Sequence, residues 1–384
     1  MNPHFTIKNN FQKRSEHYSD ILTEEILSDI CKKITGQAEF TVEFIDETNV
    51  GRLAILQYND SISYISLSED TISGRNSSFQ SIPSAFVRYY LDETEKKNMF
   101  FYFLPAEGSY GSAYFTFMYR LMTTAGINIL NAEDYLGQTI KPFISPDDLI
   151  VTRDSNRSRN RSNNSTYITK NQRNIIEIYG KTYGASKKET TLLSVALSNI
   201  SENPIDLYQI TEQGLTVLPG PDMQVLERLG NINIVFTDIT LERNEFEKEN
   251  SLRSPRYIYN LLAKLGPKKC SFCECEIPEL IQGAHLWPVA DIKKTSSLNI
   301  EQKIDHATNG DNGIWLCENH HTLFDTNILN VEPTGALSIS EGIDVKSKGF
   351  IEQITSQWQI EDEILNEQVS TYIRLRYGAQ QQQA

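Results

Sequence analysis

The sequence has few cysteines and no long apolar run. It has only five cysteines and three tryptophans in 384 residues. A small, odd number of cysteines argues against a disulfide framework, and the polar segment 1–19 has no apolar core of the kind that signal peptides carry. No apolar run approaches the roughly 20 residues that a membrane-spanning helix needs. We therefore expect a soluble, cytoplasmic protein with reduced cysteines and no membrane partner.

An excess of positive charge is also lacking. The net charge is −14 and the sequence pI is about 5.0, which disfavours a protein that coats nucleic acid without selectivity. The segment 151–190 is the exception, because it holds nine basic residues against three acidic ones and is net +6. Such asymmetry is typical of a surface that faces phosphates. A nucleic-acid enzyme with a local basic segment therefore remains open.

The scarce cysteines and histidines gather in one window, between Cys270 and His321. A Cys270-x2-Cys273 pair is followed, after 43 residues (274–316), by Cys317-x2-His320. Two such turns can close a Cys3His tetrahedron, the usual geometry of structural zinc. Cys275 could compete with Cys273, but the x2 spacing favours Cys273. The alternatives are a disulfide pair or scattered buried thiols, and a reducing compartment makes the disulfide less favourable.

Three polar residues of the same window are left over once the zinc ligands are set aside: His285, Asn312 and His321. Phosphodiester hydrolysis needs an activated water, a held phosphate and neutralised charge on the leaving oxygen. A neutral imidazole is a suitable general base near neutral pH, a second imidazole can bind a divalent metal, and an amide can orient the base. We interpret His306 as a solvated loop residue and not as a ligand.

The order of these motifs carries a resemblance to a known family. The chain reads Cys-x2-Cys, Ala284-His-Leu-x-Pro, Asn312-Gly-Ile-x-Leu-Cys and His320-His-x-Leu-Phe-Asp. This series resembles the HNH endonucleases with a ββα-metal fold, in the branch found at the C-terminus of many bacterial restriction enzymes. It covers roughly residues 254–335, and it is specific because several short blocks occur in the same order and spacing.

The resemblance implies roles for individual residues. His285 would be the general base at a strand, Asn312 would orient it through its amide oxygen, and His321 would bind the catalytic divalent metal, Mg²⁺ or Mn²⁺. The chain departs from the family at Ala284, where many members carry a second metal ligand. The metal would then be held by His321 with Asp325, Asn312 or waters, and Asp325 could equally cap or buttress the end of its helix.

The patterning predicts an α+β chain in four parts: a mixed N-terminal domain (1–150), a DNA-recognition region (151–250), the HNH nuclease domain (251–335) and a helical tail (336–384). Residues 1–19 read as a loose arm, followed by a helix over about 20–34 that stops at Gly36. Further expected elements are strands at 40–45, 54–58, 61–67, 99–104, 127–130, 174–179, 206–210 and 233–236, and helices at 86–92, 114–124, 223–229 and 255–265. Residues 192–200 form an apolar stretch. The tail, with helical spacing over 350–377, is expected to serve packing or dimerisation.

The recognition region supplies the expected DNA contacts. Its serine- and asparagine-rich stretch 153–165 is either a solvated loop or an arginine loop that becomes ordered on DNA. A glycine- and lysine-containing stretch follows, without a Walker loop. We expect DNA-binding side chains at Arg153, Arg157, Arg159, Arg161, Lys181, Lys187 and Lys188. Glu95-Lys96-Lys97 fits half of another nuclease motif, but no acidic partner precedes it on a strand, so we interpret it as a solvated face.

Together these patterns predict a type II restriction endonuclease of a prokaryotic cytoplasm, with structural zinc and a catalytic Mg²⁺ or Mn²⁺. Its substrate would be double-stranded DNA, and a homodimer would match a two-fold symmetric site. Three rivals remain open: a modification-dependent nuclease with a pocket for a modified base, a defence effector that cuts unselectively once a ligand triggers it, and a zinc module that binds DNA without cutting.

Overall fold

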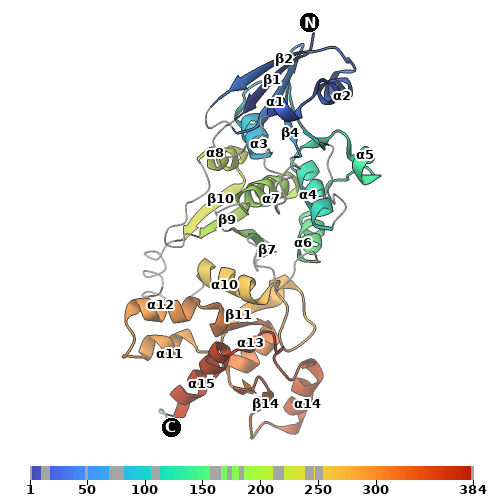
Figure 1. Cartoon of the computed structure of the whole chain (residues 1–384). Helices are drawn as coiled ribbons and strands as arrows, with labels where there is room; N and C mark the ends of the chain where they lie inside the picture. The colour runs from blue at the N-terminus through green and yellow to red at the C-terminus, as the bar shows by residue number, and fades with distance from the viewer. Residues whose placement is uncertain are drawn as a thin grey trace. The chain divides into compact units, whose positions relative to one another are not determined.

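The computed structural model describes residues 2–9, 18–47, 51–68, 82–104, 113–155, 166–170, 175–180, 186–210, 220–237, 246 and 254–381 (Figure 1). The chain divides into two compact units. The first contains residues 1–156, 187–202 and 218–232, and the second contains 157–186, 203–217 and 233–384. Helices and strands mix in both units, so the α+β class is confirmed.

A mixed six-stranded sheet, in the order β2-β1-β3-β4-β5-β6, organises the first unit. Strand β1 pairs in parallel with β2 and antiparallel with β3, β3 and β4 form an antiparallel pair, and β5 and β6 continue in parallel. The strands are β1 (His4–Asn9), β2 (Thr41–Asp46), β3 (Leu53–Tyr58), β4 (Ser61–Leu67), β5 (Lys97–Tyr102) and β6 (Asn128–Ile129).

Helices of the first unit begin and end where local signals predict. In α2, the Thr23 hydroxyl accepts from the main-chain N–H of Ile26, and the helix stops at Gly36, whose φ of 78° favours glycine. The buried side chains of α2 pack with those of β1 and β3 in one core. The helices are α1 (Tyr18–Ile21), α2 (Glu24–Thr35), α3 (Ile82–Leu91), α4 (Ala113–Thr124), α5 (Ala132–Leu136), α6 (Pro146–Ser155), α7 (Ser186–Ile200) and α8 (Gly220–Leu229).

The expectation of a loose N-terminal arm is wrong for residues 4–9. These residues form β1, which lies between β2 and β3 and has Phe5 and Ile7 fully buried. The alternation of buried and half-buried residues is that of a strand with one face on the core. The pattern is short and runs into a polar segment, which is why it did not stand out in the sequence.

The second unit contains three sheets. Strands β7 (Thr166–Lys170), β8 (Ile176–Gly180), β9 (Ile205–Ile210) and β10 (Ile232–Thr237) form a sheet in the order β10-β9-β8-β7. Two antiparallel pairs follow, β11 (Ile281–His285) with β12 (Gly313–Cys317), and β13 (Leu329–Val331) with β14 (Leu337–Ile339). The helices are α10 (Pro255–Leu265), α11 (Val289–Lys294), α12 (Ile300–Thr308), α13 (Glu318–Asp325), α14 (Val345–Ile354) and α15 (Glu367–Gln381), with short 3₁₀ turns η3 (Pro278–Leu280) and η4 (Gly310–Asn312).

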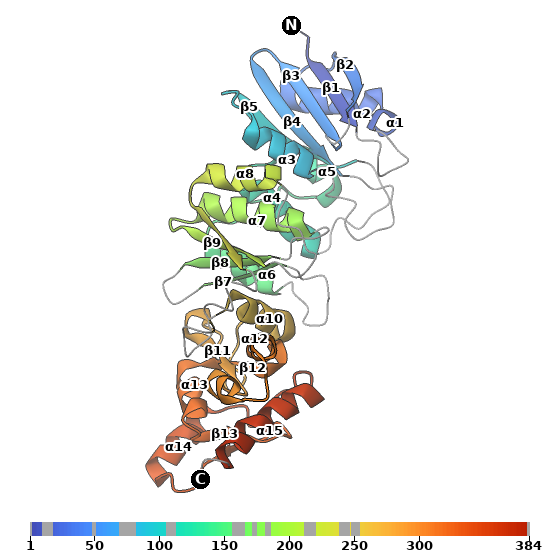
Figure 2. The same ribbon diagram turned by 90° about the vertical axis from the view of Figure 1, so that its left-hand side faces the viewer.

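Helix α10 packs closely on the β11–β12 hairpin, as both ribbon views show (Figures 1 and 2). Gly283 and Gly313 make this approach possible, because a Cβ on either residue would overlap with Leu261 on the helix. A Cβ on Gly313 would also overlap with the Tyr257 hydroxyl. The two glycines therefore bring the helix face that carries Tyr257 onto the hairpin.

The C-terminal helices belong to the core of the second unit. Val369, Tyr372 and Ile373 of α15 are 1 % exposed and join the same cluster as Trp315 and Phe272 of the hairpin region. The tail is two helices separated by a non-helical stretch at 355–366. The tail therefore packs in the core of the second unit, which is the first of the two roles expected for it.

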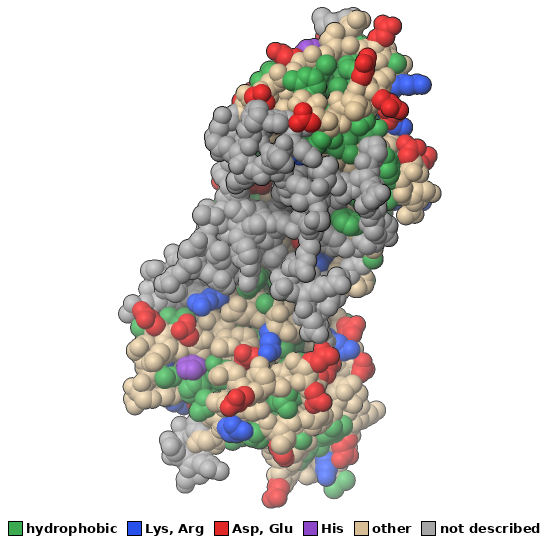
Figure 3. Space-filling view, viewed as in Figure 1, with side chains coloured by type: hydrophobic (Ala, Val, Ile, Leu, Met, Phe, Trp, Pro, Cys, Tyr) green, Lys and Arg blue, Asp and Glu red, His purple; other side chains and the backbone are tan. Residues whose placement is uncertain are grey.

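Charged side chains of both signs are interspersed on the described part of the face in Figure 3. Within the described residues, no helix is both long and apolar enough to cross a membrane.

Candidate active site and metal centre

The hairpin and the helix after it carry the three predicted catalytic residues: His285 and His321 line one cavity, whereas Asn312 is fully buried and does not line it. His285 is the last residue of β11, and its partner in the antiparallel register is Gly313, the first residue of β12. Asn312 therefore precedes the strand directly opposite His285. Strand β12 ends at Cys317, which is also the N-cap of α13, and this helix carries His320 and His321. The order β11, β12, α13 gives the ββα arrangement.

His285 is held as a neutral imidazole near neutral pH. Its Nε2 lies 2.8 Å from the main-chain oxygen of Ala307. A carbonyl oxygen only accepts, so Nε2 carries the hydrogen and Nδ1 is the basic nitrogen. The pKa of His285 is lowered to about 4, chiefly because the ring is buried; the charge of His321 adds to the lowering and the Ala307 carbonyl opposes it. Near neutral pH, the ring can therefore accept a proton.

The side chain of Asn312 hydrogen-bonds to main-chain atoms, and the His285 ring is not among its partners within the described residues. The Asn312 side chain is fully buried: its oxygen accepts from the main-chain N–H of Trp287 at 2.7 Å, and its nitrogen donates to the oxygens of Trp287 and His306 at 3.1 and 3.0 Å. The amide thus ties the segment after β11 to α12. Because Ala307, next to His306, accepts from the His285 ring, Asn312 positions the base through the main chain.

His321 and Asp325 lie on one face of α13, four residues apart, with Nε2 and Oδ2 separated by 3.5 Å. An imidazole nitrogen and a carboxylate oxygen at this separation suit one divalent ion of the Mg²⁺ or Mn²⁺ type. Ala284 is fully buried opposite Ile314 in the hairpin, so that position adds no ligand. An ion held by His321 and Asp325 would keep its other positions for water and phosphate.

Tyr257, on α10, packs flat on the ring of His285. The ring centroids are 4.0 Å apart and the planes differ by 11°. Tyr257 is 2 % exposed, and its hydroxyl has no hydrogen-bond partner among the described residues. Burial raises the pKa of this phenol well above its usual range, so it stays protonated. Tyr257 fixes the plane of the base and shields one of its faces from water.

We expect the two substitutions of Tyr257 to have different effects. Tyr257→Ala removes the stacked ring, should cost about 3–5 kcal/mol of unfolding free energy, and should slow single-turnover cleavage at least tenfold because His285 becomes mobile and hydrated. Tyr257→Phe keeps the ring and deletes only the unpaired hydroxyl, so stability and rate should stay near those of the parent. Thermal unfolding and single-turnover rates test this pair, and an equal loss in both variants would assign the effect to the hydroxyl.

Arg376, on α15, is a buried cation beside the same residues. Its guanidinium donates to the main-chain oxygens of His285 and Phe324 at 3.2 and 2.6 Å, and it lies 3.9 Å from Asp325. It therefore ties the end of β11 to the end of α13. One feature of the sequence indicates that Arg376 is buried. Arg376 falls on the apolar stripe of the tail helix, four residues after Tyr372, where a charged residue is unusual.

The four predicted zinc ligands come together at the other end of the hairpin. The donor atoms of Cys270, Cys273, Cys317 and His320 all lie within 4.8 Å of one another. A tetrahedral zinc ion with Zn–S of ~2.3 Å and Zn–N of ~2.1 Å places two sulfurs about 3.8 Å apart and a sulfur and nitrogen about 3.6 Å apart. The separations are 3.9 Å for Cys273–Cys317, and 3.5 and 3.2 Å from His320 Nδ1 to Cys270 and Cys317. The donor set fits structural zinc, and Cys275 is outside it.

A hydrogen bond to Thr355 fixes the orientation of the His320 ring. Its Nε2 lies 3.1 Å from the hydroxyl of Thr355, which itself donates to the main-chain oxygen of Ile351 at 2.7 Å. The Thr355 hydroxyl must therefore accept from Nε2–H, which leaves Nδ1 free of hydrogen and directed at the sulfurs. The segment after α14 also donates two main-chain N–H groups, from Ser356 and Gln357, to the oxygen of Phe272 in the first knuckle.

The interpretation of His306 as a solvated loop residue is wrong. His306 lies in α12, whose start is fixed by a capping box between Asn299 and Gln302. Its Nδ1 is 3.0 Å from the hydroxyl of Tyr372, and its ring packs edge-on against Trp287. His306 therefore joins α12 to the tail helix.

Of the predicted DNA contacts, Arg153 is the one whose side chain is described, and it is not on the surface. It is 4 % exposed and its guanidinium lies 2.7 Å from the carboxylate of Glu189, also buried. This ion pair joins α6 to α7 within the first unit, so Arg153 is withdrawn as a DNA contact. Lys187 and Lys188 lie in α7, but their side chains are outside the described residues, as are Arg157, Arg159, Arg161 and Lys181 altogether.

The geometry defines a class of protein domain: a two-stranded hairpin followed by a helix, with a buried neutral histidine, a histidine–aspartate pair and a Cys3His cluster that fits zinc. Residues 270–331 match the family model described as HNH endonuclease. This segment is an HNH endonuclease domain, and the chain thus carries a nuclease domain of a kind that acts on DNA. A comparison with curated proteins gives no match. Tyr257 and Arg376 lie on either side of the matched segment, so His285 has neighbours outside the segment that the family model covers.

Proposed function

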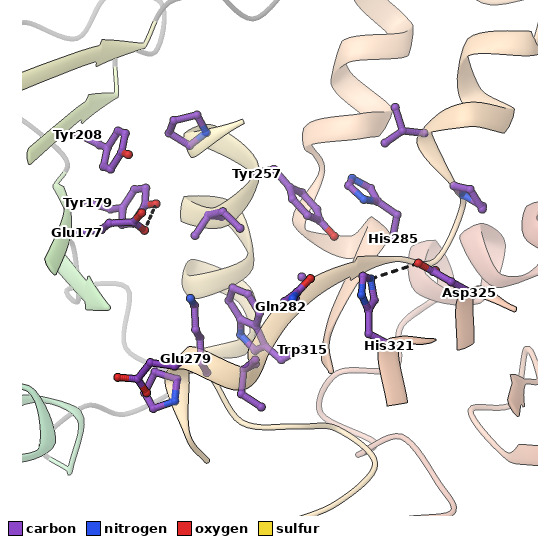
Figure 4. A pocket seen from close by; sticks show the side chains of 18 of the residues that line it. Glu177, Tyr179, Tyr208, Tyr257, Glu279, Gln282, His285, Trp315, His321 and Asp325 are labelled. Atoms are coloured by element: carbon purple, nitrogen blue, oxygen red, sulfur yellow. Dashed lines mark hydrogen bonds and ion pairs between the residues drawn. The ribbon is translucent and has the colours of Figure 1, made fainter. Parts of the chain in front are cut away.

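We propose that this protein is a site-specific endonuclease for double-stranded DNA, of the type II restriction class. The observation that carries the proposal is the placement of a neutral His285 in one cavity with His321 and Asp325. A base and a metal-binding pair facing the same space are the two elements that hydrolysis of a phosphodiester requires. The lining of that cavity is drawn in Figure 4.

In this mechanism, His285 Nδ1 accepts a proton from a water molecule whose oxygen attacks the phosphorus. The bond from phosphorus to the 3′-oxygen breaks, and the 3′-oxygen takes a proton from solvent water, which leaves a 5′-phosphate and a 3′-hydroxyl. The proton on His285 returns to solvent. Mg²⁺ or Mn²⁺ on His321 and Asp325 would supply the positive charge that stabilises the leaving oxygen. The Ala307 carbonyl keeps the hydrogen of His285 on Nε2, and Arg376 holds Asp325 in place through its charge.

The remaining parts of the proposal concern DNA recognition and assembly. The net charge of +6 in segment 151–190 supports DNA contacts from that region. The proposed contacts are Arg157, Arg159, Arg161, Lys181, Lys187 and Lys188. We further propose a homodimer, because cutting both strands of a symmetric site calls for two catalytic centres, and a prokaryotic cytoplasm as the location.

The test is cleavage of unmodified phage DNA with Mg²⁺ or Mn²⁺, with the His285→Ala variant alongside and the ends sequenced. Discrete fragments that share one short motif, and that disappear in the variant, are expected. A smear would replace the proposal by an unselective effector, and cutting of modified DNA alone would replace it by modification-dependent restriction. If no DNA is cut under any of these conditions, the protein is not an active nuclease.

The pKa of His285 predicts a pH dependence. Cleavage should rise as pH increases through about 4 and level off above about 6, because the ring must be neutral to accept a proton. The free energy of unfolding should also rise with pH over this range. Between pH 6.5 and 4 the unfolded chain binds a proton at this histidine that the folded chain does not, so unfolding free energy falls with falling pH, by up to about 3 kcal/mol.

Denaturant unfolding of the parent and of His285→Gln across this pH range isolates the contribution of the one histidine. The difference between the two proteins should shrink as pH falls from 6.5 to 4. A constant difference would mean that His285 keeps an ordinary pKa.

A further inference from the structure

The cavity that contains the catalytic residues extends to the face of another sheet. It has a volume of about 890 Å³, and all of its lining residues belong to the second unit. His285, His321 and Asp325 line one part of it (Figure 4). Another part is lined by side chains of β8 and β9, which the hydrolytic mechanism does not use.

Four side chains of β8 and β9 share one sheet face there. The parallel register places Glu177 opposite Asp206 and Tyr179 opposite Tyr208. The two tyrosine rings stack, with centroids 4.7 Å apart and planes within 8°. Tyr179 is buried, and its hydroxyl donates to Glu177 at 2.8 Å. Tyr208 is partly exposed and is therefore the outer ring of the stack.

The charge of this wall is unsuited to phosphate. Glu177 and Asp206 lie directly opposite each other across the two strands, an arrangement that like charges disfavour. Lys268 is the nearby cation of the lining, and its ammonium donates to the main-chain oxygen of Lys170 at 3.5 Å and lies 5.9 Å from the centre of the Trp315 ring. Two carboxylates against one lysine favour a ligand that presents hydrogen-bond donors.

Asp206 is the acceptor of this wall that has capacity for a ligand. Among the described residues it accepts one hydrogen bond, from the Asn233 amide to Oδ1 at 3.0 Å. A carboxylate has about four lone-pair sites, so Oδ2 can accept from a group that enters the cavity.

We propose that this part of the cavity receives one unstacked nucleobase that carries an exocyclic amino group, adenine or cytosine. The base would stack on the outer face of Tyr208 and donate its amino group to Asp206, beside the phosphodiester at His285. Aromatic side chains bind unstacked bases of any sequence by stacking, whereas a carboxylate selects an amino group. The proposal rests on the function proposed above and names the base that the nuclease reads next to its cut.

The first test is the sequence of the ends produced by the parent protein and by three variants. In the parent, adenine or cytosine is expected at one fixed position near the cut. Asp206→Asn should weaken that preference by roughly tenfold, in line with the discrimination that one good side-chain contact to a base supplies. Tyr208→Ala should lower both the cleavage rate and the preference for adenine or cytosine. Tyr208→Phe keeps the stacking ring and should retain both at the parental level. Glu341→Gln, an exposed acid elsewhere in the second unit, is the matched control.

The second test asks whether the base leaves the helix. A duplex with 2-aminopurine beside the preferred position, where its fluorescence rises when the neighbouring base leaves the stack, is bound to the slowly cutting His285→Ala variant. Fluorescence should rise severalfold on binding, and the rise should vanish when Tyr208→Ala is added to the same protein. Tight binding without a rise would overturn the proposal, as would ends without any base preference. If the parent neither binds nor cuts DNA, the proposed function itself fails, which is a different result.

Discussion

Replacing Cys317 by serine, or removing zinc with a strong chelator, is expected to unfold the catalytic part of the second unit. Binding of structural zinc contributes about 10–16 kcal/mol in small zinc domains, which exceeds the roughly 5–15 kcal/mol by which domains are stable. Cys317 ends β12 and caps α13, so losing its bond to zinc releases the hairpin and the helix together. His321 and Asp325 lie on that helix, and cleavage should therefore be lost with the fold.

Tryptophan fluorescence measures this unfolding directly. All three tryptophans of the chain, Trp287, Trp315 and Trp358, belong to the second unit. Their emission should shift to longer wavelength in Cys317→Ser and in the chelated protein, and bound zinc should fall from one ion per chain to none. Cys275→Ser is the matched control, because Cys275 neighbours the cluster without belonging to it. A folded Cys317→Ser protein without zinc would show that the cluster is dispensable for the fold.

The zinc cluster and the hairpin were accessible from the sequence because their geometry is local. Each pair of ligands is three residues apart, and a turn or the first turn of a helix suffices to bring such a pair together. His285 at the end of one strand and Asn312 before the next follow from the same short motifs. The helix of residues 255–265 was predicted with the bounds that α10 has, since Ser254 caps its start and Gly266 follows its end.

What the sequence could not supply are contacts between elements distant along the chain. Tyr257 packs on His285 across 28 residues, and Arg376 reaches His285 across 91. Neither contact follows from periodicity, which says only which helix face is buried. The partner of Asn312 was missed for a related reason: its amide bonds main-chain atoms, and main-chain positions depend on how α12 packs.

The tertiary setting also decides which charged residues are at the surface. Arg153 belongs to a chain segment rich in arginine, so composition favoured a DNA contact. Its position near the end of α6 instead points the guanidinium at Glu189, and the pair is buried together. A buried ion pair is costly to form but more costly to break. Arg153→Ala should therefore affect stability and not DNA affinity.

Replacing His285 by alanine is expected to reduce the single-turnover cleavage rate by about 10²–10⁴, the usual contribution of a positioned general base. DNA binding should persist, because the substitution leaves His321, Asp325 and the basic segment intact. Tryptophan emission should also stay unchanged, which distinguishes this variant from Cys317→Ser. His306→Gln is the matched control for the cleavage rate: it alters a half-buried histidine of the same unit that contacts Tyr372 and Trp287 and does not line the cavity.

Chemical rescue separates the loss of a base from the loss of structure. The side chain removed in His285→Ala lies between Tyr257 and the main-chain oxygen of Ala307, so imidazole added to solution has both a stacking surface and an acceptor for its N–H. The cleavage rate should rise with the concentration of neutral imidazole and should follow the pKa of imidazole itself. Rescue should fail in the double variant His285→Ala/Tyr257→Ala, which lacks the stacking ring. A His285→Ala protein that cuts at the parental rate would place the general base elsewhere, and an impaired one that imidazole does not rescue would make His285 a structural residue of the hairpin.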